Sequence, residues 1–272
     1  MCRVYRVFLL AALASLGLTS GATEVTPRAD AARRNFDVQG TSDGRTAAIR
    51  EAAERIRSAA FGTLLEQESP RPWLERCVIH VHATPDSFAA AVGMPPAEAR
   101  GATSLEFSGD RVWSRRIDVM GDGTDVIPDA LAHELVHVVL ADHFVHAAPP
   151  RWADEGLAIL FDDPEKQLGH EEDFREARKR GLEFSGDDLL ALEDYPTDGG
   201  RQRVFYGQSA ALVRWLIARR DAATFIRFVG DVQAADTATA LKRHYDLDSP
   251  AFLESAWKEV PTIHSLSFIN RK

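Results

Sequence analysis

The sequence contains little cysteine, no excess of basic charge, and no long hydrophobic run after its first residues. Its two cysteines, Cys2 and Cys77, are too few for a disulfide-stapled fold. Acidic residues outnumber basic ones by 41 to 32, which excludes a general nucleic-acid binder, because phosphate recognition needs a basic surface. No internal repeat marks a solenoid or propeller. These absences leave a globular chain of 272 residues, of which 45% are hydrophobic.

Residues 1–22 have the composition of a secretory signal peptide. Arg3 and Arg6 precede a short apolar stretch, and Ser20 and Ala22 supply the small residues expected before a cleavage site. The apolar stretch is shorter than the ~20 residues that span a bilayer as a helix. We therefore expect a secreted or periplasmic protein that keeps no stable membrane span after cleavage. An uncleaved N-terminal anchor is the alternative.

The remaining chain divides into three parts by pattern. Residues 23–69 combine a polar leader with a helix, residues 70–165 carry strand patterns followed by two helices, and residues 166–272 are mostly helical. Strands first and helices later predict an α+β fold with a helical C-terminal subdomain. The expected strands are 77–83, 101–107 and 111–120, and the expected helices are 45–65, 86–92, 127–143, 151–161, 169–181, 205–220, 222–233, 235–245 and 250–259.

The motif HELVH at residues 133–137 gives the clearest indication of a chemical function. Residues i and i+4 of a helix share one face, so His133 and His137 can reach a single cation. Zinc accepts imidazole nitrogen and prefers four ligands. Glu134 projects beside that pair, where it can contact water and act as a general base without binding the metal. Two structural histidines on a buried helix are the alternative.

A third ligand follows in the segment PPRWADEGLA. Glu155, on a second helix, would complete a site of two histidines and one glutamate and would leave a fourth position for water. Its neighbour Asp154 could orient a ligating histidine by accepting a hydrogen bond from it. Asp154 could equally be an acidic residue that the positive end of a helix favours.

A rival third ligand is His143, which stands where metzincin zinc proteases place their last histidine. That motif needs a glycine where this chain has Leu140, and it needs a methionine downstream of His137, where none occurs. We therefore prefer Glu155 to His143 as the third ligand, and His146 is a weaker rival still.

The segments HELVHVVL and PPRWADEGLA resemble the gluzincin metallopeptidases, especially small secreted peptidase MA-like domains, over roughly residues 77–220. The resemblance implies a zincin-like mixed sheet with an active-site helix. It also implies one Zn²⁺ per chain, bound by His133, His137 and Glu155, with Glu134 as the catalytic base. Trp-x-x-Glu-Gly-x-Ala is shared with zinc aminopeptidases. Their Gly-x-Met-Glu-Asn signature is absent upstream of the motif. This absence disfavours an aminopeptidase and favours an endopeptidase, but the sequence does not decide between an endopeptidase and an exopeptidase.

Hydrolysis of a peptide bond also needs a donor for the developing oxyanion. Tyr206, in the segment FYGQSAAL, resembles the tyrosine that opens a helix in related gluzincins and serves this purpose. Packing of Tyr206 beside Phe205 and Trp215 is the alternative. Tyr195 and His244 are weaker rivals for the role.

Two of the predicted strands have features that bear on binding. The strand ending Ile117–Met120 is expected to be an edge strand on which an extended peptide substrate could lie by main-chain pairing. His80 and His82 share one face of an earlier strand, because side chains alternate along a strand. They could bind a metal together, but a solvated strand face is the favoured interpretation.

Together these patterns predict a secreted, single-zinc metallohydrolase that cleaves a peptide or protein substrate and binds no nucleic acid. A non-catalytic, zinc-stabilised binding or assembly factor at the cell envelope is the second hypothesis, because a fold does not decide a function. A hydrolase of non-peptide amides is the third. No pattern in the sequence predicts an oligomeric state.

Overall fold

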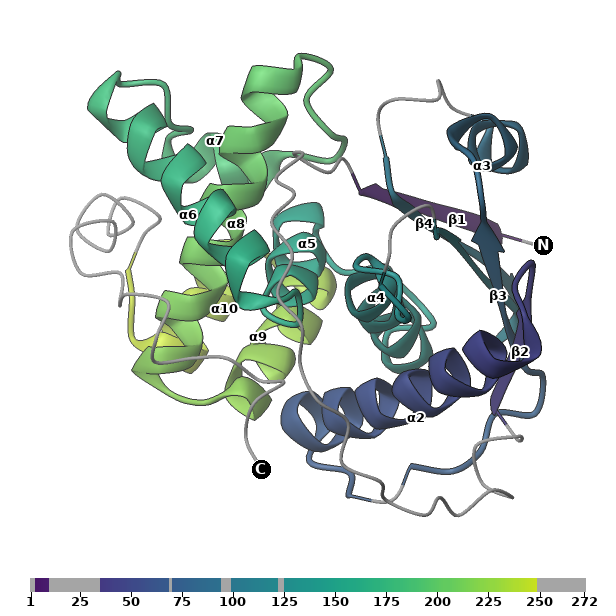
Figure 1. The fold of residues 1–272 in the computed structure, drawn as a ribbon. Coiled ribbons are helices and arrows are strands. Elements are labelled where there is room, and N and C mark those ends of the chain that lie inside the picture. Colours follow the sequence, from purple (N-terminus) through teal and green to yellow (C-terminus); the bar gives the residue numbers. More distant parts are fainter. Residues whose placement is uncertain (1–2, 10–34, 69, 94–98, 122–124, 249–272) are drawn as a thin grey trace. The chain divides into compact units, whose positions relative to one another are not determined.

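The computed structural model describes residues 3–9, 35–68, 70–93, 99–121 and 125–248 and shows the expected α+β fold (Figure 1). The chain divides into two compact units. The first comprises Met1–Arg55 and Arg71–Leu135, and the second comprises Ile56–Pro70 and Val136–Lys272. No helix among the described residues is both long and apolar enough to cross a membrane.

The first unit contains a mixed five-stranded sheet in the order β1-β4-β5-β3-β2. Strands β2, β3 and β5 run parallel to one another, whereas β4 is antiparallel to β5 and β1 is antiparallel to β4. The strands predicted from alternation are confirmed as β3, β4 and β5. The bounds are β1 (Arg3–Leu9), β2 (Phe36–Gln39), β3 (Cys77–His82), β4 (Gly101–Ser108) and β5 (Arg111–Met120).

The predicted edge position of Ile117–Met120 is wrong. Strand β5 pairs with β4 on one side and with β3 on the other, so this segment lies inside the sheet and all four of its residues are buried. The outer edge of β4 is paired with β1, which falls within the predicted signal segment 1–22. Cleavage of that segment would remove β1 and expose the edge of β4.

Strand β2 was not predicted, because its sequence lies in the polar leader. Its Phe36 and Val38 are buried, and it pairs in parallel with β3 from Phe36 opposite Cys77 onward. Four residues carry too little alternation to identify a strand, so this strand depends on its pairing with β3. The predicted domain limits at 23–69, 70–165 and 166–272 stay predictions.

Three helices accompany the strands in the chain order: α2 (Asp43–Leu65), α3 (Pro85–Val92) and α4 (Leu131–His143). Thr84 caps α3 by accepting a hydrogen bond from the Ser87 amide, and Pro85 occupies its first turn. Phe88 of α3 belongs to a buried cluster that includes Ala102 of β4 and Met120 of β5, so α3 covers one face of the sheet.

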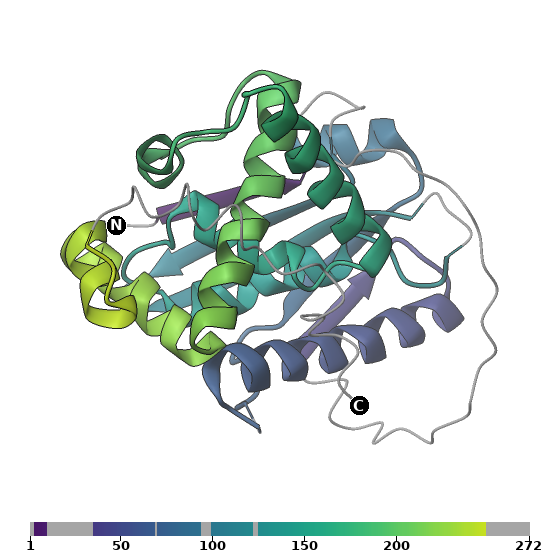
Figure 2. The same cartoon turned by 90° about the vertical axis from the view of Figure 1, so that its left-hand side faces the viewer.

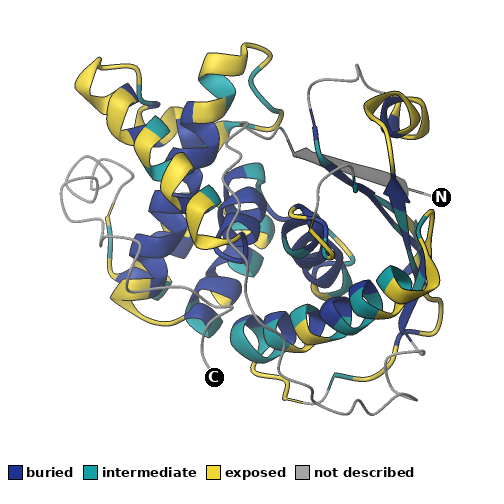
Figure 3. Ribbon diagram, in the orientation of Figure 1, coloured by how far each residue is buried: buried dark blue, intermediate teal, exposed yellow. Residues whose placement is uncertain are grey.

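The second unit is built from helices, as predicted. Its buried hydrophobic residues gather most on α8, with further ones on α4, α5 and α9 (Figure 3). Aspartates cap α6, α8, α9 and α10 by accepting hydrogen bonds from first-turn amides. Helix α6 runs beside α8 (Figure 2). The predicted helix 250–259 lies outside the described residues, and α7 was not predicted. The bounds are α5 (Arg151–Ile159), α6 (Pro164–Lys179), α7 (Gly186–Ala191), α8 (Gly199–Arg219), α9 (Ala222–Ala234) and α10 (Thr237–Tyr245).

Candidate metal centre

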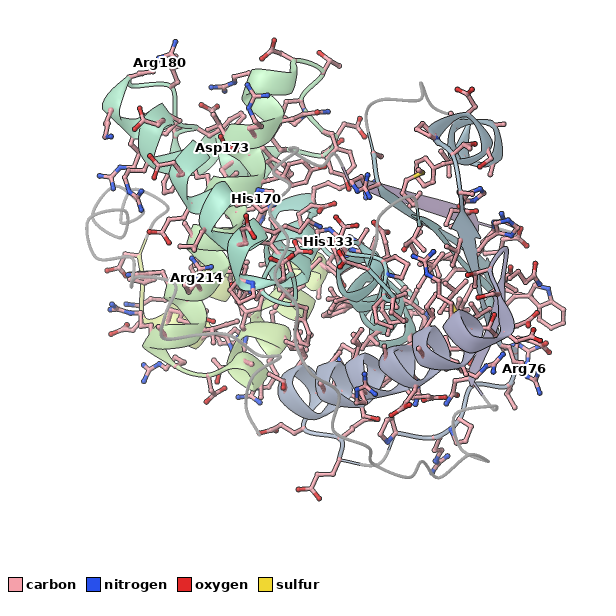
Figure 4. All side chains as sticks on the ribbon, viewed as in Figure 1. Arg76, His133, His170, Asp173, Arg180 and Arg214 are labelled. Carbon is pink, nitrogen blue, oxygen red and sulfur yellow. The ribbon has the colours of Figure 1, made fainter. Side chains whose placement is uncertain are left out.

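The three predicted ligands form one buried group. One ligand atom from each of His133, His137 and Glu155 lies within 4.8 Å of the other two, and no side chain of the three is more than 1% exposed. The two histidines come from successive turns of α4, and Glu155 comes from α5 (Figure 4 labels His133). Two imidazole nitrogens and one carboxylate oxygen are a donor set that zinc accepts.

The orientation of His137 is fixed by Asp154. Its Nδ1 lies 2.9 Å from Asp154 Oδ1, and both side chains are buried. A hydrogen bond from Nδ1–H to this carboxylate leaves the lone pair on Nε2, which is the atom that a metal requires. Of the two roles considered for Asp154, the structure therefore supports that of orienting a ligating histidine.

The distances suit a metal of the size of zinc. Nε2 of His137 lies 3.9 Å from Oε2 of Glu155. Two ligands of a tetrahedral zinc ion, each at about 2.1 Å from the metal, are separated by roughly 3.4 Å. For this pair, a shift of a few tenths of an ångström in each side chain closes the difference. The donor set of two imidazole nitrogens and one carboxylate oxygen, all within 4.8 Å of one another, fits the ion.

Glu155 is held in place by close packing of its helix. A Cβ on its neighbour Gly156 would lie 2.7 Å from the carbonyl oxygen of Ser209 in α8. Only a residue without a side chain permits this approach, so α5 and α8 are in backbone contact immediately beside the carboxylate. This close approach of the two helices explains why a glycine occupies position 156.

The carboxylate of Glu134 lies against strand β4. The Thr103 hydroxyl donates a hydrogen bond to Glu134 Oε2 at 2.7 Å, and the Cβ of any residue other than glycine at position 101 would lie 2.5 Å from Glu134 Oε1. Gly101 and Thr103 thus form a seat for the predicted general base. Neither residue was predicted from the sequence, because no motif links Gly101 or Thr103 to the HELVH helix.

Tyr195 contacts the other carboxylate of the site. The Tyr195 hydroxyl donates a hydrogen bond to Glu155 Oε1. Tyr206 is buried on α8, with its ring centroid 6.2 Å from that of Tyr195 and 5.9 Å from that of His170. Burial, and secondarily the nearby Glu155 carboxylate, raises the pKa of Tyr195 well above its ordinary value, so its phenol stays protonated and able to donate.

The rival residues lie elsewhere. His143 and His146 are exposed, and neither belongs to the buried group of ligand atoms found among the described residues. His244 in α10 is paired with Asp231 in α9 at 2.8 Å. Tyr195, one of the weaker rivals, does contact a predicted ligand, and its place between α7 and α8 gave no sequence signal for this.

The predicted solvated face of β3 is wrong for His82. This histidine is only 5% exposed, and its Nε2 lies 2.7 Å from Asp118 Oδ1 on β5. Arg116 donates two further hydrogen bonds to the same carboxylate. The cause is the register of β3 and β5, which brings Asp118 next to His82. The hydrogen bonds that His82 and Arg116 make to this carboxylate allow His82 and Asp118 to be buried together.

Comparison of the chain with known proteins does not identify a family. No model of a known protein family matches the chain, and no curated protein matches it in sequence. The assignment of a function therefore depends on the buried group of His133, His137 and Glu155 on an α+β fold.

Proposed function

We propose that this protein is a zinc-dependent metallopeptidase of the gluzincin type that acts outside the cytoplasm. One observation carries the proposal: His133, His137 and Glu155 gather their ligand atoms in a buried position, and Asp154 orients His137. Burying histidine and carboxylate groups costs desolvation free energy unless a partner compensates for it. The convergence of three such groups in a buried position therefore favours a metal site over coincidental packing.

The roles of the residues follow from what each can do. His133, His137 and Glu155 would hold the zinc ion, which would supply polarisation of a substrate carbonyl and a lowered pKa of water. Glu134, seated against β4 by Thr103, accepts a proton from the attacking water and passes it to the leaving amine. Tyr206 donates to the oxyanion that develops on the substrate carbonyl.

We place the peptide substrate along the edge of β4. Gly101 and Thr103 of this strand contact Glu134, so a peptide chain paired with β4 would pass beside the general base. Main-chain pairing to an exposed strand edge is a recurring way to bind an extended peptide. If residues 1–22 are cleaved after export, β1 is removed and the edge of β4 becomes available to a peptide.

The variant Glu134→Gln tests the proposal. It keeps the shape of the side chain and all three metal ligands but cannot take up a proton, so zinc content should stay near one ion per chain. Hydrolysis of a denatured protein substrate should fall by about 100-fold or more. Hydrolysis that persists in this variant would refute the role of Glu134. Zinc binding by the wild type with no cleavage of any peptide would favour the non-catalytic binding factor.

A further inference from the structure

Tyr195 makes a specific contact with a predicted metal ligand that the proposed mechanism does not use. It lies on the segment that joins α7 to α8, and its hydroxyl donates a hydrogen bond to Oε1 of Glu155 on α5. The two residues are 40 positions apart in the chain. The contact is therefore tertiary, and the fold brings this phenol to this one oxygen.

The two oxygens of the Glu155 carboxylate have different neighbours. Oε1 accepts the hydrogen bond from Tyr195, whereas Oε2 lies 3.9 Å from His137 Nε2. Nδ1 of His137 is bonded to Asp154, so its Nε2 is the atom that can bind a metal. Of the two oxygens, Oε2 approaches that nitrogen and Oε1 accepts the hydrogen bond from Tyr195.

The Tyr195 ring is itself held firmly by its surroundings. Its face carries the guanidinium of Arg151 at 5.1 Å, and its edge meets Phe205 with ring centroids 6.1 Å apart and ring planes at 90°. Tyr206 packs against it as well. A phenol fixed by three side chains provides a directional hydrogen bond, because the ring cannot turn away without breaking this packing.

We propose that Tyr195 is a positioning residue that occupies Oε1 of Glu155 so that the carboxylate binds zinc through Oε2 alone. This inference rests on the metal site of the proposed function and adds its mode of coordination. One-oxygen binding keeps the site at three protein ligands, and the fourth position stays open for water and substrate. Residues that hydrogen-bond to metal ligands typically contribute 10–100-fold in metal affinity.

Two substitutions separate the hydrogen bond from the packing. Tyr195→Phe keeps the ring and removes the donor, whereas Tyr195→Gln removes the ring and keeps a donor. The matched control is Tyr245→Phe, because Tyr245 is also buried in the second unit but its hydroxyl has no hydrogen-bond partner among the described residues. Zinc affinity is measured by chelator competition, and the visible absorption of the Co²⁺-substituted protein reports the coordination number. Circular dichroism of each metal-free variant verifies folding.

The hydrogen bond predicts a definite order of affinities. Tyr195→Phe should bind zinc about 10-fold more weakly than the wild type, Tyr195→Gln should bind more tightly than Tyr195→Phe, and Tyr245→Phe should match the wild type. The Co²⁺ absorption of Tyr195→Phe should weaken, as expected when a second carboxylate oxygen joins a four-coordinate ion. If Tyr195→Phe does not fold, zinc affinity of Tyr195→Gln within about threefold of the wild type supports the same conclusion.

Other results overturn the inference, and they differ from those that overturn the proposed function. Equal zinc affinity and equal Co²⁺ spectra in the wild type and Tyr195→Phe would refute the role of Tyr195 alone. Weaker binding by Tyr195→Gln than by Tyr195→Phe would assign Tyr195 to packing. A wild type that binds zinc, shows the predicted order of variants and hydrolyses nothing would refute the peptidase and leave the role of Tyr195 intact. A wild type that binds no zinc would refute both.

Discussion

The seat of Glu134 on β4 provides the sharpest test of how this fold supports catalysis, through the substitution Gly101→Ala. The added Cβ would lie 2.5 Å from Glu134 Oε1 and 2.8 Å from Glu134 Cγ. Ordinary contacts begin near 3.4 Å, so the carboxylate must move by about 1 Å. Oε2 is tied to Thr103 at 2.7 Å, so this movement also strains or breaks that hydrogen bond.

The expected effect follows from the size of the movement. A misplacement of about 1 Å in a catalytic group costs roughly 100-fold in rate, and we expect kcat to fall by about that factor. The three metal ligands are not touched, so zinc content should stay near one ion per chain. The same Cβ would lie 2.8 Å from Ala130 Cβ, and crowding of this kind costs about 1–3 kcal/mol of stability.

The assay compares turnover of a denatured protein substrate with zinc content and thermal unfolding in the same preparations. Gly62→Ala is the matched control, because a Cβ there would meet no atom of the described residues within 4 Å, and it should keep full turnover. Unchanged kcat in a folded, zinc-loaded Gly101→Ala variant would refute the claim that Gly101 and Thr103 position the Glu134 carboxylate for catalysis. Loss of zinc in this variant would show that β4 supports the metal ligands instead of the base.

Two further predictions concern Tyr206 and the buried cluster around Asp118. Tyr206→Phe should lower kcat by about 100-fold and leave zinc affinity unchanged, as measured by turnover and chelator competition; an unchanged kcat would exclude Tyr206 as the oxyanion donor. Burial alone would raise the pKa of Asp118, but hydrogen bonds from Arg116 and His82 outweigh it and hold that pKa below its ordinary value. The ionised carboxylate therefore stabilises the fold above about pH 4, and this contribution is lost as pH falls through the folded-state pKa. Urea unfolding at several pH values should show Asp118→Asn about 3 kcal/mol less stable than the wild type near pH 7, with the gap shrinking below pH 4. A gap that is constant with pH would contradict this account.

Local patterns predicted much of the fold because they depend on neighbouring residues. The HELVH spacing places His133 and His137 on one face of α4, and alternation identified β3, β4 and β5. Burial of both faces of a strand produces a continuous apolar run, which distinguishes an inner strand from an edge strand. The run Ile117–Met120 carries this signal, interrupted only by Asp118, yet the order of strands in a sheet depends on pairing and was predicted wrongly.

The remaining features of the site depend on contacts between distant segments. Tyr195 reaches Glu155 from a loop, and Thr103 reaches Glu134 across 31 positions of the chain. A hydroxyl-bearing residue in a loop or a strand has no periodicity that marks it as a hydrogen-bond donor to a catalytic carboxylate. The same reasoning applies to His82, whose burial depends on Asp118 in a neighbouring strand.

Metal analysis of the purified protein beside its Glu155→Ala variant tests the ligand set itself. We expect about one zinc ion per chain in the wild type and almost none in the variant, because two histidines alone give an incomplete and weak site. Zinc retained at full occupancy in Glu155→Ala would contradict the ligand set of His133, His137 and Glu155. No zinc in the wild type, even after incubation with the metal, would contradict the metal site itself.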